Sequence, residues 1–164
     1  GTDRDDVIYA GSGNDKVFGN RGNDLLFGGT GHDKMDGGKG HDIIAGGYGA
    51  DYLTGGTGCD TFVFLSAFDS LACACDVIAD FNRYQDRIDL SAIDADAGRS
   101  GDQTFIFAGQ TNSSDVTANG VTWYYDRDLD RTIIVADTDG DTDTAELEII
   151  LSGKVTLTHD NFVL

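Results

Sequence analysis

A nine-residue repeat fills residues 1–63 and constrains the fold more than any other feature of this chain. Seven consecutive nonapeptides follow one another without insertion, and positions one, two and four of the repeat are mostly glycine. Within each repeat, the eighth residue is large and apolar and the sixth residue is an aspartate. The seven aspartates are Asp6, Asp15, Asp24, Asp33, Asp42, Asp51 and Asp60. This strict register predicts a repeat architecture in which each unit buries its apolar residue against its neighbours.

The spacing within one repeat also points to a chemistry. Glycines permit positive φ and turn the backbone carbonyls to one side, where the aspartate adds a carboxylate. The last three residues suit a short strand with its central side chain pointing inward. If each turn reverses the chain, repeats 18 residues apart stack on one edge. Ca²⁺ takes about six to eight oxygen ligands, more than one turn offers, so the pattern predicts calcium between stacked turns.

The repeat resembles the GGxGxDxUx consensus of the RTX family of secreted calcium-binding proteins. The resemblance implies an all-β fold with a parallel β-roll, a right-handed calcium-binding β-helix. Positions two, four and six of one turn would face positions one, three and six of the turn 18 residues on, holding about five to six Ca²⁺ ions. The implied ligands are Asp6, Gly11, Gly13, Asp15, Gly19, Asn20, Arg21, Gly22, Asp24, Gly28, Gly29, Thr30, Gly31, Asp33, Gly37, Gly38, Lys39, Gly40, Asp42, Gly46, Gly47, Tyr48, Gly49, Asp51, Gly55, Gly56, Thr57, Gly58 and Asp60.

Both ends of the repeat region depart from the consensus. The first repeat has Thr2 and Arg4 in place of glycines, which weakens the predicted site of Asp6. Residues 64–72 lack glycine but keep an aspartate, Asp69, at the sixth position of the count. Asp69 is therefore a candidate to close the turn that contains Asp51.

The residues that flank each inward position must point outward, and they differ between the two predicted sheets. In the odd-numbered repeats they are mostly apolar, as with Leu25, Phe27 and Ile43, whereas in the even-numbered repeats they are mostly polar. An apolar outer face on one sheet predicts docking against the rest of the chain or against an N-terminal remainder of the protein. Full exposure of these three residues would contradict that prediction.

Beyond residue 63 the pattern changes to alternating apolar segments. Strands are predicted at 104–108, 121–125, 132–136 and 145–151, with 161–164 as a last strand or a tail. The stretch 70–81 has the composition for a short helix. We therefore divide the chain into a β-roll at 1–72 and a β-sandwich-like C-terminal region at 73–164.

Three segments, GCDTFVF, CDVIADF and DRIDLSAID, resemble the C-terminal domain of serralysin-type metalloproteases. In this resemblance Asp76 and Asp80 are candidate ligands at the last turn, and Asp86 and Asp89 are weaker ones; turn-forming or strand-capping roles are equally compatible with each. The ending HDNFVL resembles the C-terminal signal of type I secretion substrates. Because the chain opens at Gly1, we expect it to be part of a longer, secreted bacterial protein.

Charge and cysteine content limit the partners. The chain has 29 acidic and 11 basic residues, a net charge of −18, which disfavours nucleic acid and anionic membranes. No apolar run approaches the roughly 18 residues of a membrane span. The three cysteines are either incidental small residues or include a bridge from Cys59 to Cys73 or Cys75.

An acidic stretch at 137–148, DTDGDTDTAELE, imitates the ligand spacing of an EF-hand loop. The acids are Asp137, Asp139, Asp141, Asp143 and Glu148. An EF-hand needs glycine at its sixth position and flanking helices, whereas this stretch has Thr142 and predicted strands. The sequence therefore favours an acidic hairpin turn over a calcium site.

No catalytic signature is found: HExxH, GxSxG and a phosphate-binding loop are missing from the sequence. The favoured function is a calcium-dependent folding and secretion module, with calcium, the N-terminal remainder and the type I secretion apparatus as partners. The alternative is a polysaccharide-binding module beside an extracellular catalytic domain, such as an alginate-modifying enzyme. Its candidate stacking residues are Tyr48, Tyr52, Trp123, Tyr124 and Tyr125. An enzymatic role for this chain itself is the weakest alternative.

Overall fold

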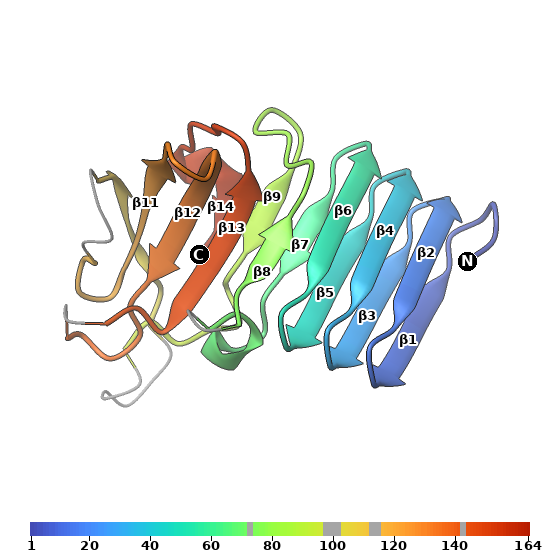
Figure 1. Ribbon diagram of the computed structural model, residues 1–164, viewed down its shortest axis with the longest axis horizontal. Helices are drawn as coiled ribbons and strands as arrows, with labels where there is room; N and C mark the ends of the chain where they lie inside the picture. The colour runs from blue at the N-terminus through green and yellow to red at the C-terminus, as the bar shows by residue number, and fades with distance from the viewer. Residues whose placement is uncertain (72–73, 97–102, 112–115, 142–143) are drawn as a thin grey trace.

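Two sheets lie face to face along the whole length of the protein in the computed structural model, which describes residues 1–71, 74–96, 103–111, 116–141 and 144–164. In the N-terminal half the strands follow the repeats. They are β1 (Val7–Ser12), β2 (Lys16–Arg21), β3 (Leu25–Thr30), β4 (Lys34–Lys39), β5 (Ile43–Tyr48), β6 (Tyr52–Thr57) and β7 (Thr61–Val63). Successive strands alternate between the sheets and stack side by side (Figure 1). The predicted all-β fold with a parallel β-roll is confirmed.

The eighth position of each repeat builds the core between the sheets. Leu26, Met35, Ile44 and Phe62 are fully buried. Strands 18 residues apart pair in parallel register, so that Leu26 lies opposite Ile44 in β3 and β5. In the middle of the roll, each inward side chain therefore lies between the corresponding residues of two other repeats, and the period of the sequence sets the register of the sheet.

The C-terminal region extends the same two sheets. After a 3₁₀ helix, η1 (Ala67–Asp69), its elements are β8 (Asp76–Ile78), β9 (Arg87–Asp89), β10 (Ile106–Gln110), β11 (Gly120–Asp126), β12 (Arg131–Ala136), β13 (Leu147–Ser152), η2 (His159–Asn161) and β14 (Phe162–Val163). One sheet has the order β1-β3-β5-β7-β9-β14 and the other β10-β11-β12-β13-β8-β6-β4-β2. Both sheets, and one hydrophobic core, continue past the division that we predict at 72/73.

Most of the predicted C-terminal strands form, with shifted ends. The segments predicted at 121–125, 132–136 and 145–151 correspond to β11, β12 and β13, and the last four residues contain β14. The helix predicted within 70–81 is wrong for the described part of that stretch, which contains β8 instead. Apolar Val77 and Ile78 extend the sheet there, and Ile78 is fully buried. The helices of the described segments are too short to cross a membrane.

The outer face of the odd-numbered sheet is partly covered. Leu25 and Phe27 are half-buried, and the ring of Phe27 stacks on that of Tyr9 at 4.7 Å between centroids. Ile43 is 42% exposed, while Ala45 in the same strand is buried. The 3₁₀ helix η1 contacts β5, and Leu65 just before it lines a hollow with Phe27 and Ala45. The rest of the chain thus covers one end of this face, and its N-terminal end stays open.

Candidate metal sites

The turns between strands bring backbones closer together than any side chain would allow. Gly31 and Gly49 occupy the same turn position in repeats 18 residues apart, with φ of 130° and 138°. A Cβ atom on Gly49 would lie 1.7 Å from the carbonyl oxygen of Gly31. Glycine is therefore required at this position by both the left-handed backbone and the close approach of the next carbonyl.

The position-six aspartates form a continuous chain of hydrogen bonds along each edge of the roll. The backbone N–H of Asp33 donates to Oδ1 of Asp51 at 2.8 Å, and the N–H of Asp51 donates in turn to Oδ1 of Asp76. The other donor–acceptor pairs of this kind are Asp6–Asp24, Asp15–Asp33, Asp24–Asp42, Asp42–Asp60 and Asp60–Asp86. We call these residues the Asp ladder.

The second carboxylate oxygen of most ladder aspartates is buried and has no hydrogen-bond donor. These atoms are Oδ2 of Asp15, Asp24, Asp33, Asp42, Asp51, Asp60 and Asp76. A buried carboxylate oxygen without a partner carries a large desolvation cost unless a cation compensates it. Seven such oxygens, along the two edges of the roll, indicate positions that suit a cation.

Backbone carbonyls converge on the same places. A Cβ placed on Gly28 would meet Oδ2 of Asp33 at 2.4 Å and the carbonyl oxygen of Gly46 at 2.5 Å. The equivalent position at Gly37 is bounded by Oδ2 of Asp42 and by the carbonyl of Gly55. Oxygens of two stacked turns thus surround a space that only glycine leaves free, and hard oxygen ligands of this kind fit Ca²⁺.

The residues at position three offer backbone carbonyls at the same turns. The carbonyl oxygens of Thr30, Lys39, Tyr48 and Thr57 each accept an N–H from the glycine 17 residues earlier, at 2.8–2.9 Å. A carbonyl has two lone pairs, so each of these oxygens keeps one for a metal. A metal ligand at position three would thus be a backbone oxygen, which is compatible with the variable side chains there.

Burial changes the acidity of the ladder carboxylates. Burial raises the pKa of Asp51 and of Asp60 to about 6, against an ordinary value of 3.8, and raises the pKa of Asp76 to about 9. Neighbouring aspartates act in the same direction, whereas the backbone N–H that each carboxylate accepts opposes the shift. The charged form of these groups is thus unfavourable in the fold without a cation.

The end of the ladder differs from the prediction for Asp69. The described residues 64–71 do not continue the repeat; Oδ2 of Asp69 accepts the N–H groups of Leu65 and Ser66 and caps η1. The ladder place opposite Asp51 belongs to Asp76, whose carboxylate is fully buried. Asp69 raises the pKa of Asp51 and of Asp76 by its charge, so it lies near this place without occupying it.

Two further aspartates lie beside the last turn. Asp86 takes the ladder place opposite Asp60, but its Oδ2 also accepts the N–H of Asn82 at 2.8 Å. Asp80 accepts the N–H groups of Gly55 and Gly56, one on each carboxylate oxygen. Asp80 thus covers the exposed backbone of the last complete turn, and its role as a metal ligand stays a prediction.

The first repeat provides its own hydrogen-bond donor. Oδ2 of Asp6 accepts the backbone N–H and the hydroxyl of Thr2. Its carboxylate therefore has no oxygen like the unpartnered ones of the other repeats. This difference follows from Thr2, which replaces the consensus glycine.

Other candidate residues have structural roles in the described parts of the chain. Nδ1 of His32 accepts the N–H of Ala50, and Nδ1 of His41 accepts that of Cys59, so both histidines link stacked turns. Cys59 and Cys75 are free thiols. Cys73, the remaining candidate for a bridge, lies outside the described residues.

Comparison with known proteins shows the family of this chain. The family model described as Peptidase M10 serralysin C terminal matches residues 6–164. The solution structure of the AlgE6R2 subunit of the Azotobacter vinelandii mannuronan C5-epimerase is 30% identical, with a TM-score of 0.62, over 94% of this chain and 90% of that chain. The AlgE6R3 subunit of the same enzyme is also 30% identical, with a TM-score of 0.45, over 99% of this chain and 80% of that chain. No curated protein matches.

The family match covers the repeats and the C-terminal region together. It describes the C-terminal part of a peptidase, and the AlgE6R2 structure is a subunit of an epimerase, so these relatives are parts of larger enzymes. The repeats are calcium-binding repeats of the RTX type on a parallel β-roll. The chain belongs to the serralysin C-terminal family of M10 peptidases.

Proposed function

We propose that this module is a non-catalytic part of a larger secreted enzyme and folds when its ladder binds Ca²⁺ outside the cell. The observation that carries the proposal is the row of buried aspartate oxygens without donors. About five Ca²⁺ ions would lie between stacked turns, with Asp60 and Asp86 offering a sixth place. The five paired aspartates are Asp15/Asp33, Asp24/Asp42, Asp33/Asp51, Asp42/Asp60 and Asp51/Asp76.

Metal binding would supply the free energy that the roll otherwise lacks. Most repeats of the roll bury only their position-eight residue, which gives a small core for 63 residues. The buried carboxylates repel one another at neutral pH, so the chain without metal favours the unfolded state. Metal affinity then becomes folding free energy.

Export of an unfolded chain would fit this dependence. Extracellular calcium modules bind at roughly 10⁻⁴ to 10⁻³ M, so such sites fill outside a bacterium and stay empty inside it. The last residues, which resemble a type I secretion signal, are folded here: Phe162 is buried and β14 pairs with β9. We infer that the secretion apparatus recognises the C-terminal residues before calcium binding causes them to fold.

The test is far-UV circular dichroism of the chain in excess chelator and in millimolar calcium. Without calcium we expect the β-sheet signal to be lost, and we expect it to return on calcium addition. Magnesium at the same concentration is the control for ionic strength. A sheet signal that is unchanged in chelator contradicts the proposal.

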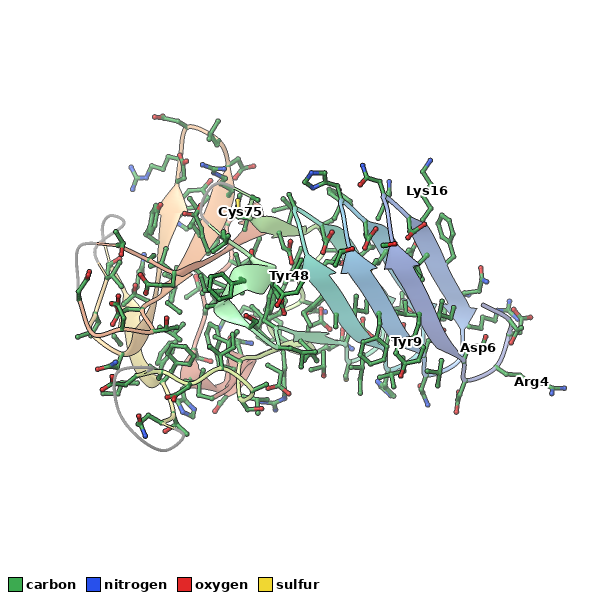
Figure 2. All side chains as sticks on the ribbon, turned by 90° about the horizontal axis from the view of Figure 1, so that it is seen from below. Arg4, Asp6, Tyr9, Lys16, Tyr48 and Cys75 are labelled. Atoms are coloured by element: carbon green, nitrogen blue, oxygen red, sulfur yellow. The ribbon has the colours of Figure 1, made fainter. Side chains whose placement is uncertain are left out.

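A second candidate function, binding of an acidic polysaccharide, rests on the outer face of the other sheet. Lys16, Lys34 and Tyr52 lie side by side on β2, β4 and β6, and all three are exposed. The ammonium group of Lys34 lies 5.2 Å from the ring centroid of Tyr52. Figure 2 shows Lys16 projecting away from the body of the roll. In so acidic a chain, this row of positive charge beside an aromatic ring suits a sugar with carboxylate groups.

The other aromatic candidates differ in exposure. Trp123 is buried, and Tyr124 and Tyr125 are half-buried, while Tyr48 is exposed.

Titration of the calcium-loaded chain with mannuronan oligosaccharides tests the row. We expect Lys34→Ala to weaken binding at least about tenfold, because a cation and a cation–π contact are lost. Arg4→Ala, at the N-terminal end, removes one positive charge elsewhere and is the matched control. If both variants weaken binding equally, the row of Lys16, Lys34 and Tyr52 is not the binding site.

A further inference from the structure

We propose a separate Ca²⁺ site, outside the repeats, at the turn between β12 and β13. Its ligands are Asp137, Asp139 and Glu146, whose carboxylates each offer an oxygen within 4.8 Å of those of the other two. The site shares no residue with the Asp ladder. This proposal can therefore be tested independently of the metal sites of the β-roll.

Asp137 provides the observation that points to a ligand. Its side chain is fully buried. Oδ2 accepts the backbone N–H groups of Asn119 and Gly140, whereas Oδ1 is buried without any hydrogen-bond partner. An unpartnered buried carboxylate oxygen is costly, and the carboxylate that carries it lies close to two more carboxylates. A divalent cation resolves both the missing partner and the mutual repulsion.

The other two carboxylates are held in place by the turn itself. Oδ1 of Asp139 accepts the N–H of Asp141 at 3.0 Å. Oε2 of Glu146 accepts the N–H of Thr138 at 2.9 Å, and Oε1 accepts the hydroxyl of Thr144 at 2.8 Å. These bonds orient the oxygens before a metal arrives, which lowers the cost of binding.

The ion pairs found among the described residues, Arg21–Asp3 and Arg131–Asp126, lie elsewhere and do not neutralise this cluster. Three carboxylates favour a hard cation, and Ca²⁺ accepts their irregular arrangement more readily than Mg²⁺, which demands near-octahedral geometry. Asp139 is exposed and Glu146 half-buried, so water can complete the coordination shell.

The ligand set differs from that of an EF-hand. EF-hand spacing would use Glu148, but Glu148 lies opposite Val135 in the sheet, and its charge acts on Cys75 and Tyr124. Glu146 supplies the third carboxylate instead, because its N–H donates to the carbonyl of Ala136 at the turn end of the hairpin. Asp143 lies outside the described residues and is not part of the proposal.

The metal would join three separate segments of the C-terminal region. Asp137 holds the backbone of Asn119, and the side-chain amide of Asn119 donates to the carbonyl of Ala95. Glu146 also lines a cavity of about 450 Å³ together with Leu65 and Ile93. We infer that calcium at this site orders the loops that enclose the cavity, independently of the roll.

The experiment counts calcium ions bound to the whole chain by native mass spectrometry, with hydrogen exchange as a second measurement. We expect Asp139→Asn and Glu146→Gln each to bind one ion fewer than wild type at about 1 mM calcium. Asp128→Asn, which removes one charge from the exposed turn between β11 and β12, should keep the full count.

In wild type, calcium should also slow amide exchange at 137–147, and Asp139→Asn should abolish that effect while exchange at 28–60 stays protected. An unchanged count in both site variants, or an equal loss in Asp128→Asn, overturns the proposal. If instead the Asp ladder does not bind calcium, the result differs, because calcium would then leave amide exchange at 28–60 unchanged.

Discussion

The backbone of Asp33 is hydrogen-bonded to the side chain of Asp51, the aspartate at the same position two repeats later: the N–H of Asp33 donates to Oδ1 of Asp51 at 2.8 Å. That bond satisfies one oxygen of Asp51 and leaves Oδ2 buried without a partner. The same relation repeats along the ladder, so most of its aspartates accept an N–H from the preceding turn and also present an unpartnered oxygen to the space between turns. Stacking of the repeats and the proposed binding of calcium therefore involve the same side chains.

Loss of one ladder charge should weaken calcium binding much more than loss of a charge nearby. Asp42→Asn keeps an oxygen for the N–H of Asp24 but places an amide where Oδ2 stood. We expect the calcium midpoint of folding, followed by circular dichroism, to rise at least about tenfold. Asp36→Asn, half-buried in the neighbouring strand and outside the ladder, should shift it less than about twofold. Equal shifts would show that net charge alone controls the midpoint.

Glycine substitutions should separate backbone strain from steric overlap. Gly13 and Gly49 both have positive φ, but a Cβ on Gly13 meets no atom within 4 Å, whereas one on Gly49 meets a carbonyl at 1.7 Å. In the calcium-loaded protein we expect Gly13→Ala to lower the free energy of unfolding by about 1–2 kcal/mol. Gly49→Ala should lower it by more than about 3 kcal/mol, or prevent folding. Urea denaturation in calcium measures both, and equal losses would contradict the close approach.

Acid should favour the roll when calcium is absent. Burial raises the pKa of Asp51 and Asp60 to about 6 and that of Asp76 to about 9, so the folded state binds protons more tightly than the unfolded state. Their contribution to stability is fully present below about pH 4 and is lost as pH rises through 6 and then 9. In decalcified buffer we expect more β-sheet at pH 4 than at pH 7. With calcium present the order should reverse, since protons compete with the metal.

The last ladder place should depend on Asp76 and not on Asp69. Asp76→Asn removes the fully buried carboxylate opposite Asp51 and should lower the number of bound calcium ions by one. Asp69→Asn weakens the cap of η1 and should cost about 1 kcal/mol while leaving the count unchanged. Native mass spectrometry gives the count, and loss of an ion only in Asp69→Asn would assign the place to that residue.

The net negative charge is distributed unevenly along the chain. Residues 1–63 contain 10 acidic and 5 basic residues, and the remaining 101 residues contain 19 and 6. Most of the excess acid therefore lies outside the ladder. Part of it is the cluster at the β12–β13 turn, where buried Asp137 faces Asp139 and Glu146.

The sequence by itself determined the ladder and the core of the roll. The period of nine is strict, so each inward residue and each position-six aspartate must recur at the same place in every turn. Pairing between Asp33 and Asp51 then follows from the count of 18 alone. Such local, repeated geometry can be inferred without knowing how distant segments pack.

Only the tertiary structure decided what happens where the period ends. The partners of Asp51 and Asp60 lie 25 and 26 residues on, at Asp76 and Asp86, because an irregular segment intervenes. The partner of Asp137 could not be read from EF-hand spacing either, since strand pairing brings in Glu146 and places Glu148 near Cys75 and Tyr124. Contacts of this kind depend on the path of the connecting loops, which no period in the sequence encodes.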